Sequence, residues 1–159
     1  MSTTRADVAD FLACNRIAMV GVSRNQRDFS RSLFQEFCKR GYDMVPVNPH
    51  ASEIEGRRSF ARLQDVNPPA EGALLMTSPT ETDIIVHDCL EAGISRVWMY
   101  RASGQGAVSA WATDFCHKNN IRLVEGHCPF MFLPGTNAFH RIHGFLLKIS
   151  GRYPTSHAA

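Results

Sequence analysis

Short apolar runs alternate with amphipathic stretches along most of this chain. The runs at 17–22, 44–47, 73–77, 97–100 and 121–124 are nearly continuous in apolar residues, as in strands buried on both faces. Apolar residues recur at helical spacing in 30–40, 79–92 and 108–119, and more briefly in 7–14. A short edge strand is expected at 56–60. Alternating strands and helices predict an α/β fold, a doubly wound parallel sheet in three layers.

Local signals define where several of these helices begin and end. Ser78 suits an N-cap, Pro79 the first helical position, and Glu81 the reciprocal position of a capping box. Gly41 and Gly93 stand where helices should stop. In a doubly wound sheet, ligands lie outside the carboxyl ends of the strands, so the loops after each strand are the candidate site.

The turn after the first strand is the most informative of these loops. Gly21 lacks a Cβ, so a phosphate group could approach the backbone there, and Gly21→Val should block it while leaving the fold largely intact. The helix that follows, near Ser30, should offer free N–H groups and a positive dipole end. A tight strand-to-helix turn with no ligand would have the same pattern.

Composition and charge narrow the class of protein. The chain has 159 residues, and we expect one domain spanning 1–159. A net charge of +2 gives no reason to expect a nucleic-acid partner. No apolar run is long enough to span a membrane, and the polar N-terminus does not resemble a signal peptide. Five widely spaced cysteines favour the cytoplasm over a disulfide framework.

Motifs for common nucleotides are absent from the sequence. No G-x-G-x-x-G follows the first strand, and Asn48 stands where an acidic residue would bind the ribose of NAD. No G-x-x-x-x-G-K-[ST] loop is present either, which argues against an ordinary ATP or GTP hydrolase. Arg24, Arg27 and Arg31 beside the first turn favour a phosphate-bearing ligand, although arginines on a solvated surface are also common.

Three motifs together resemble a known family. They are G-V-S at 21–23 with the loop to Ser30, G-Y-D-M-V-P-V-N-P at 41–49, and R-V-W-M at 96–99. They are similar to the CoA-binding proteins, small stand-alone relatives of the CoA-binding domain in the alpha subunit of succinyl-CoA synthetase. The resemblance covers about 15–128. It implies a Rossmann-like fold with strand order 3-2-1-4-5-6, and coenzyme A lying along the strand ends with its phosphates by the first turn.

The resemblance and the strand-end loops together give a candidate cofactor-binding set. Its members are Gly21, Val22, Ser23, Arg24, Arg27, Ser30, Asn48, Pro49, His50, Thr77, Ser78, Pro79 and Trp98. The loop after Trp98, at 100–106, is longer than in many relatives. What the resemblance implies about contacts therefore carries over less well for the pantetheine end of CoA than for the nucleotide end.

The function expected from this set is binding of CoA or an acyl-CoA without catalysis. The synthetase also needs a phosphohistidine-bearing domain and a nucleotide-grasp subunit, and 159 residues leave no room for either. The alternatives are an NAD(P)-binding oxidoreductase or redox sensor, and a partner-binding module that has lost its ligand.

Residues near the C-terminus raise three further questions. His140 and His143 share a helical face and could bind metal with His127 and Cys128, but a solvated helix face is the simpler account and no metal site is expected. Cys128 is either a reactive thiol near the ligand or a small buried hydrophobe. The apolar run 130–133 and an amphipathic helix at about 137–150 could cover a sheet edge or form a homodimer.

Overall fold

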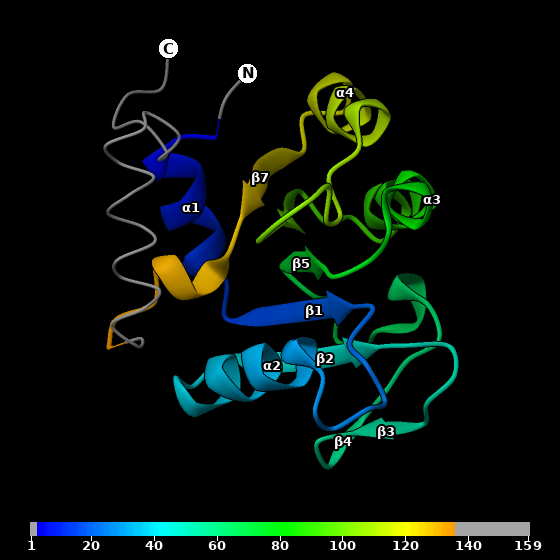
Figure 1. Cartoon of the computed structure of the whole chain (residues 1–159). Coiled ribbons are helices and arrows are strands. Elements are labelled where there is room, and N and C mark those ends of the chain that lie inside the picture. The colour runs from blue at the N-terminus through cyan, green and yellow to red at the C-terminus, as the bar shows by residue number, and fades with distance from the viewer. Residues whose placement is uncertain (1–2, 136–159) are drawn as a thin grey trace.

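A five-stranded parallel sheet forms the centre of the molecule (Figure 1). The computed structural model describes residues 3–135, so the expected helix at 137–150 and the pair His140 and His143 lie outside the described residues. The strand order is β2-β1-β5-β6-β7, and each neighbouring pair is parallel. The strands are β1 (Arg16–Val20), β2 (Asp43–Val47), β5 (Gly72–Leu75), β6 (Arg96–Tyr100) and β7 (Arg122–His127).

Helices cover both faces of this sheet, giving the expected three layers. They are α1 (Arg5–Leu12) and α2 (Phe29–Lys39) on one face, and α3 (Pro79–Glu91) and α4 (Ala110–Lys118) on the other (Figure 1).

Strand β1 shows why two cores form. Its side chains point alternately to opposite faces, so Ile17 and Met19 pack towards α1 and α2, while Ala18 and Val20 pack towards α3 and α4. All four are buried. A strand that is apolar at every position therefore stabilises both cores, as the continuous apolar runs predicted.

The order of the strands confirms the predicted topology. Phe60 makes a single parallel bridge to Val47 on the outer side of β2. If this bridge is counted as the third strand of the chain, the sheet has the expected order 3-2-1-4-5-6. The expected edge strand at 56–60 is otherwise reduced, because β3 (Glu53–Ile54) and β4 (Arg57–Arg58) pair only with each other, as a short antiparallel hairpin.

Helix boundaries follow the local signals closely. Ser78 and Glu81 form a reciprocal capping box at the start of α3, with Pro79 in the first turn, as the sequence predicted. The left-handed backbone of Gly41, with φ of 86°, ends the segment after α2.

No helix within 3–135 is long and apolar enough to cross a membrane. Two single-turn 3₁₀ helices, η1 (Leu63–Asp65) and η2 (Pro129–Met131), complete the described chain.

Candidate functional site

A cavity of about 320 Å³ opens at the carboxyl ends of β1, β2 and β5. The strand order reverses at this point: β2 lies on one side of β1, and the next strand of the sheet, β5, lies on the other side. Parallel α/β sheets bind ligands at such a switch point. The lining residues are Val20, Gly21, Val47, Asn48, Pro49, His50, Ala61, Arg62, Leu63, Thr77, Glu81, Ile84, Ile85 and Asp88.

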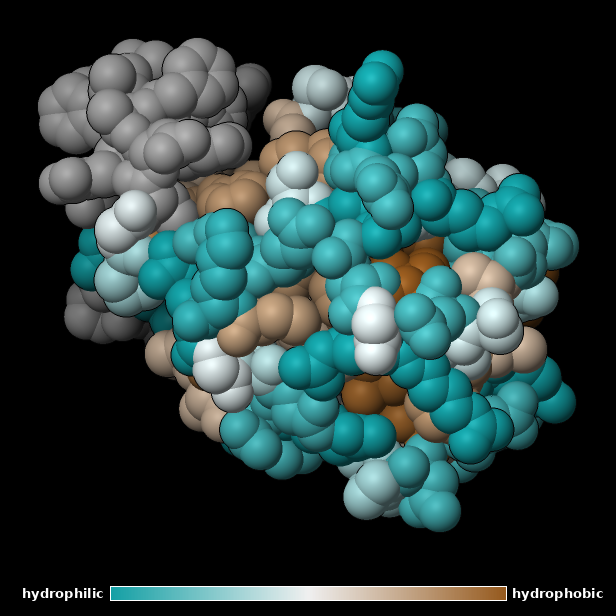
Figure 2. Space-filling view, turned by 90° about the horizontal axis from the view of Figure 1, so that it is seen from below, coloured by the Kyte–Doolittle hydropathy of each residue, from teal (hydrophilic) through white to brown (hydrophobic). Residues whose placement is uncertain are grey.

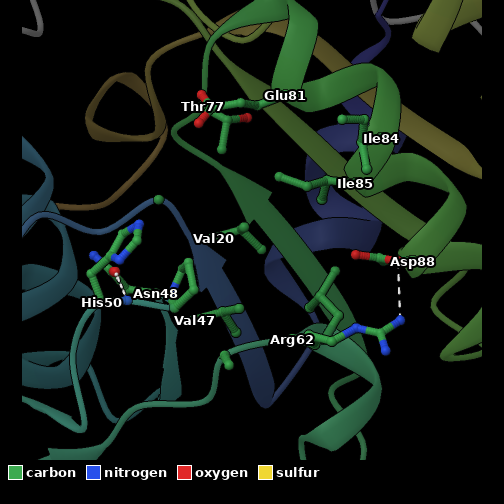
Figure 3. A pocket seen from close by; sticks show the side chains of 14 residues that line it. Val20, Val47, Asn48, His50, Arg62, Thr77, Glu81, Ile84, Ile85 and Asp88 are labelled. Atoms are coloured by element: carbon green, nitrogen blue, oxygen red, sulfur yellow. Dashed lines mark hydrogen bonds and ion pairs between the residues drawn. The ribbon is translucent and has the colours of Figure 1, made fainter.

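The walls of the cavity differ in chemistry (Figure 3). Val20 and Val47 form an apolar floor on the sheet, and Ile85 of α3 faces them from the helix. His50 and Arg62 lie on opposite sides of the opening (Figure 3). An apolar slot with a few polar groups around it is typical of sites for small molecules and cofactors.

The packing around the first turn requires a glycine at position 21, whether or not a ligand binds there. Its φ of 84° lies in the left-handed region, and a Cβ there would come within 2.9 Å of the carbonyl oxygen of Met76 and 3.0 Å of Thr77 Cγ2. The expectation that Gly21→Val would leave the fold intact is therefore wrong, because a valine would meet the backbone after β5. This substitution cannot separate binding from folding.

The N-terminus of α2 is already occupied by the protein's own side chains. Asp28 caps the helix and accepts a hydrogen bond of 2.8 Å from the backbone N–H of Ser30. The buried Ser30 hydroxyl accepts a bond of 2.9 Å from the N–H of Ser23 and donates one of 2.6 Å to Asp28. The sequence-based expectation of free N–H groups and a positive dipole end is thus corrected, because the carboxylate of Asp28 fills that position.

The three arginines beside this turn have different roles. Arg31 is buried and donates from Nε to Glu55 Oε1 at 2.8 Å and from Nη1 to the carbonyl of Ser23 at 3.2 Å, so it holds the turn in place. Arg24 and Arg27 are exposed. Of the three arginines, Arg24 and Arg27 are therefore the ones exposed to solvent beside the turn.

Asn48 connects the exits of β1 and β2. Its Nδ2 donates to the carbonyl of Val22 at 2.9 Å, and its Oδ1 accepts from the N–H of His50 at 2.8 Å (Figure 3). Val22 itself is fully buried. Pro49 and His50 are exposed at the rim of the cavity. The N-P-H segment is therefore shaped by Asn48, and within the described residues the imidazole of His50 makes no hydrogen bond.

The start of α3 forms the wall across from this segment. Thr77 lines the cavity, and its hydroxyl shares a hydrogen bond of 2.9 Å with that of Thr82. Glu81 accepts from the Ser78 N–H at 2.9 Å, and the side-chain and backbone hydrogen bonds from Ser78 lower the pKa of the Glu81 carboxyl. Ser78 and Pro79 belong to the helix cap and do not line the cavity. The N-terminus of α3, like that of α2, is therefore capped by the protein's own side chains, here with the carboxylate of Glu81.

Trp98 lies apart from the other candidates. Its side chain is 0% exposed in the middle of the sheet, and its Nε1 donates to the carbonyl of His127 at 2.9 Å. The ring packs edge-on against Phe11 with centroids 5.3 Å apart. Trp98 is therefore a core residue, and we leave it out of the site.

Sequence reasoning missed the α3 and η1 side of the cavity. Ile84 is 64% exposed although it is apolar, and it lies outside the buried helix face formed by Thr82, Val86 and Cys89. An isoleucine on the polar side of a helix was the signal that could have revealed this wall. Arg62 and Asp88 gave no comparable signal in the sequence. The loop between β4 and η1 has to follow a particular path before Arg62 comes close to Asp88 on α3 at the edge of the cavity.

The structure gives Cys128 and His127 no reactive character. Cys128 is 4% exposed, and burial raises the pKa of its thiol to about 11. Burial, followed by the charge of Arg101, lowers the pKa of His127 to about 4, so its imidazole is neutral at pH 7. A neutral imidazole supplies no positive charge to stabilise a thiolate. Within residues 3–135, no group of three histidine, cysteine, aspartate or glutamate side chains is placed to hold a metal ion.

The strand order and the cavity at the strand ends define an α/β domain of the Rossmann-like type. The model of the CoA binding domain family matches residues 15–134. This chain therefore belongs to the CoA-binding domain family, as the motifs predicted.

Its relatives include proteins of no stated function. The uncharacterized protein YneT of Bacillus subtilis is 21% identical over 126 residues, which cover 79% of this chain and 90% of that protein. A hypothetical protein from Pyrococcus horikoshii has a similar structure, with a TM-score of 0.73, 23% identity, and coverage of 79% of this chain and 87% of its own.

A larger protein has a similar domain. The dinucleotide forming acetyl-coenzyme A synthetase 1 of Ca. Korarchaeum cryptofilum matches with a TM-score of 0.60 and 18% identity over 70% of this chain and 26% of its own. At these identities, the structural likenesses establish the fold alone.

Proposed function

We propose that this protein binds coenzyme A or an acyl-CoA through its strand-end loops and catalyses no reaction of its own. The observation that carries the proposal is the cavity at the switch point of a chain in the CoA-binding domain family. Gly21, Asn48, Pro49, His50 and Thr77, which were all chosen from the sequence, line that cavity from three different loops.

The size of the cavity limits which part of the ligand it holds. Its volume of about 320 Å³ is at the lower end of the range of about 300–1,000 Å³ for small-molecule sites. It suits the adenosine end of CoA, with the flat base between the valine floor and Ile85. The diphosphate then passes over Gly21 to Ser23, and the pantetheine arm extends outside the cavity.

Charge for the phosphates has to come from side chains. Because Asp28 and Glu81 close the neighbouring helix N-termini, backbone N–H groups there supply little positive potential. Arg24 and Arg27 beside the turn, and His50 at the rim, are the exposed basic groups we assign to the phosphates. Val22, Ser23 and Ser30 shape the turn, and Ser78 and Pro79 shape the start of α3.

An NAD(P)-dependent oxidoreductase is the second candidate, and the exit of β2 disfavours it. Asn48 occupies that exit with both ends of its amide hydrogen-bonded to backbone, so no carboxylate is present there to bind a ribose diol.

The cytoplasm is the proposed location, since all five cysteines are free. A homodimer formed through the segment near 130–133 stays a prediction, which light scattering would test.

Thermal unfolding with added ligand tests the proposal. CoA and acetyl-CoA should each raise the unfolding midpoint, and NAD⁺, NADH and NADPH should not, because only a ligand of the folded state stabilises it. A rise with NAD(P) alone would overturn the proposal in favour of the oxidoreductase. No rise with any of them would favour a module that has lost its ligand.

A further inference from the structure

We propose that Asp88 recognises the base of the bound nucleotide by accepting a hydrogen bond from the exocyclic amino group of adenine. This inference rests on the proposed function and adds a specificity-determining residue to it. It arises from the end of the cavity formed by α3 and the loop before η1, where sequence reasoning had placed no residue.

Asp88 stands at one end of a stripe on α3 that faces the cavity. Glu81, Ile84, Ile85 and Asp88 all line it, and their spacing of three to four residues places them along one side of the helix. In Figure 3, Glu81 lies beside Thr77 at the opposite end of this stripe, with the two isoleucines between the carboxylates. A base packed against the isoleucines would therefore present one edge to Asp88.

The hydrogen bonds of Asp88 leave one carboxylate oxygen available. Its Oδ1 accepts a bond of 2.6 Å from Gln64 Nε2 and lies 3.9 Å from Arg62 Nη2. Within the described part of the chain, no side chain or backbone group donates to Oδ2. Gln64 thus fixes the carboxylate through one oxygen, and the other remains free to accept a hydrogen bond from a ligand.

Arg62 does not compete strongly for this carboxylate. Its side chain is 60% exposed, and 3.9 Å is close to the limit for an ion pair. Exposed pairs of this kind contribute little to stability. Arg62 can turn away when a ligand enters, while Asp88 keeps its shorter bond to Gln64.

A carboxylate in this position distinguishes purines by their substituent at carbon 6. It only accepts hydrogen bonds, so it pairs with the amino N–H of adenine and repels the carbonyl oxygen that hypoxanthine has in the same place. A hydrogen bond to a charged group corresponds to a preference of about ten- to a hundredfold. The cavity should therefore select adenine nucleotides.

The test compares CoA with deaminated CoA, in which a carbonyl oxygen replaces the 6-amino group. Calorimetric titration of the wild-type protein should give affinity at least about tenfold higher for CoA. This comparison needs no variant, so it decides the question even if a substitution impairs folding. Equal affinity for both ligands would overturn the role of Asp88 and leave CoA binding intact, whereas failure of CoA itself to bind would overturn the proposed function.

The variant Asp88→Asn gives a sharper result, because Gln64 constrains its orientation. Gln64 Nε2 also donates to Glu91 Oε2 at 2.8 Å, which holds the Gln64 amide in this orientation, so the asparagine should present its oxygen to Gln64 and its NH₂ group to the cavity. The preference should then reverse towards deaminated CoA. An unchanged preference would contradict the proposal.

Glu91→Gln is the matched control. Glu91 also accepts from Gln64 Nε2, at 2.8 Å, but it does not line the cavity. This variant removes a carboxylate from the same hydrogen-bond network and should keep the wild-type preference. Loss of the preference in Glu91→Gln would show that the network in general, and not Asp88, sets it.

Discussion

Arg24 and Arg27 are the residues whose proposed role depends most on charge. Each is exposed beside the first turn, whereas the neighbouring Arg31 is committed to Glu55. Arg24→Ala and Arg27→Ala should each weaken CoA binding by about 1 kcal/mol, or about fivefold, because exposed phosphate contacts are screened by solvent. Calorimetric titration at increasing salt concentration should show the affinity of the wild-type protein for CoA falling. The affinity of the double variant, with both Arg24→Ala and Arg27→Ala, should fall less steeply.

A matched control for these variants is available on the far side of the molecule. Lys118, at the end of α4, is also exposed and lies outside the cavity. Lys118→Ala should leave both the affinity and its salt dependence unchanged. If the two arginine variants behave like Lys118→Ala, the phosphates lie elsewhere.

His127 gives the stability of the fold a dependence on pH. Its pKa is lowered to about 4 by burial, and its buried Nδ1 has no partner within the described chain. Below pH 6.5 the unfolded chain takes up a proton at this imidazole while the folded chain does not, so stability falls as the pH falls from about 6.5 to about 4. Denaturant unfolding should show this slope, and His127→Gln should flatten it between pH 6.5 and 5, above the range where carboxylates titrate.

At the level of elements, helix α3 contributes both structure and binding surface. Its buried face holds Val86 and Cys89, and its exposed Ile84 covers the cavity. Ile84→Lys should cost little stability, because the side chain is 64% exposed, but should weaken CoA binding at least about tenfold. Calorimetry on the folded variant measures this directly.

Leu90 on the same helix provides the comparison for Ile84. It is 42% exposed and does not line the cavity. Leu90→Lys makes a similar apolar-to-lysine change less than two turns away on the same helix, and this variant should bind CoA like the wild-type protein. Equal weakening by both variants would indicate damage to α3 and not loss of a ligand contact.

The sequence predicted these elements well where a local signal decides them. The capping box of Ser78 and Glu81 is such a case, because every partner lies within four residues. The β3–β4 hairpin and the reduced pairing of Phe60 could not be anticipated, since they depend on how the chain crosses the edge of β2. Ser23 and Ser30 were selected from the sequence as candidate cofactor-binding residues, but only the structure shows that the backbone N–H of Ser23 donates to the hydroxyl of Ser30.

At the scale of the whole molecule, alternating strands and helices predicted the doubly wound parallel sheet, whereas the strand order was implied by the family resemblance. Each central strand is apolar on both faces, which requires helices above and below the sheet. Figure 2 shows one outer face as largely hydrophilic, with the most hydrophobic residues visible mainly in recesses between hydrophilic ones. The pattern could not predict that Arg62 and Asp88 line the cavity, because these two residues meet the strand ends only through tertiary packing.

The central claim is that the adenosine end of CoA occupies the cavity at the switch point. A crystal structure of the protein with CoA tests it most directly. Our account predicts the base between Val20, Val47 and Ile85, its amino group at Asp88, and the diphosphate over Gly21 to Ser23. Electron density for the nucleotide on any other surface, with this cavity empty, would contradict the account.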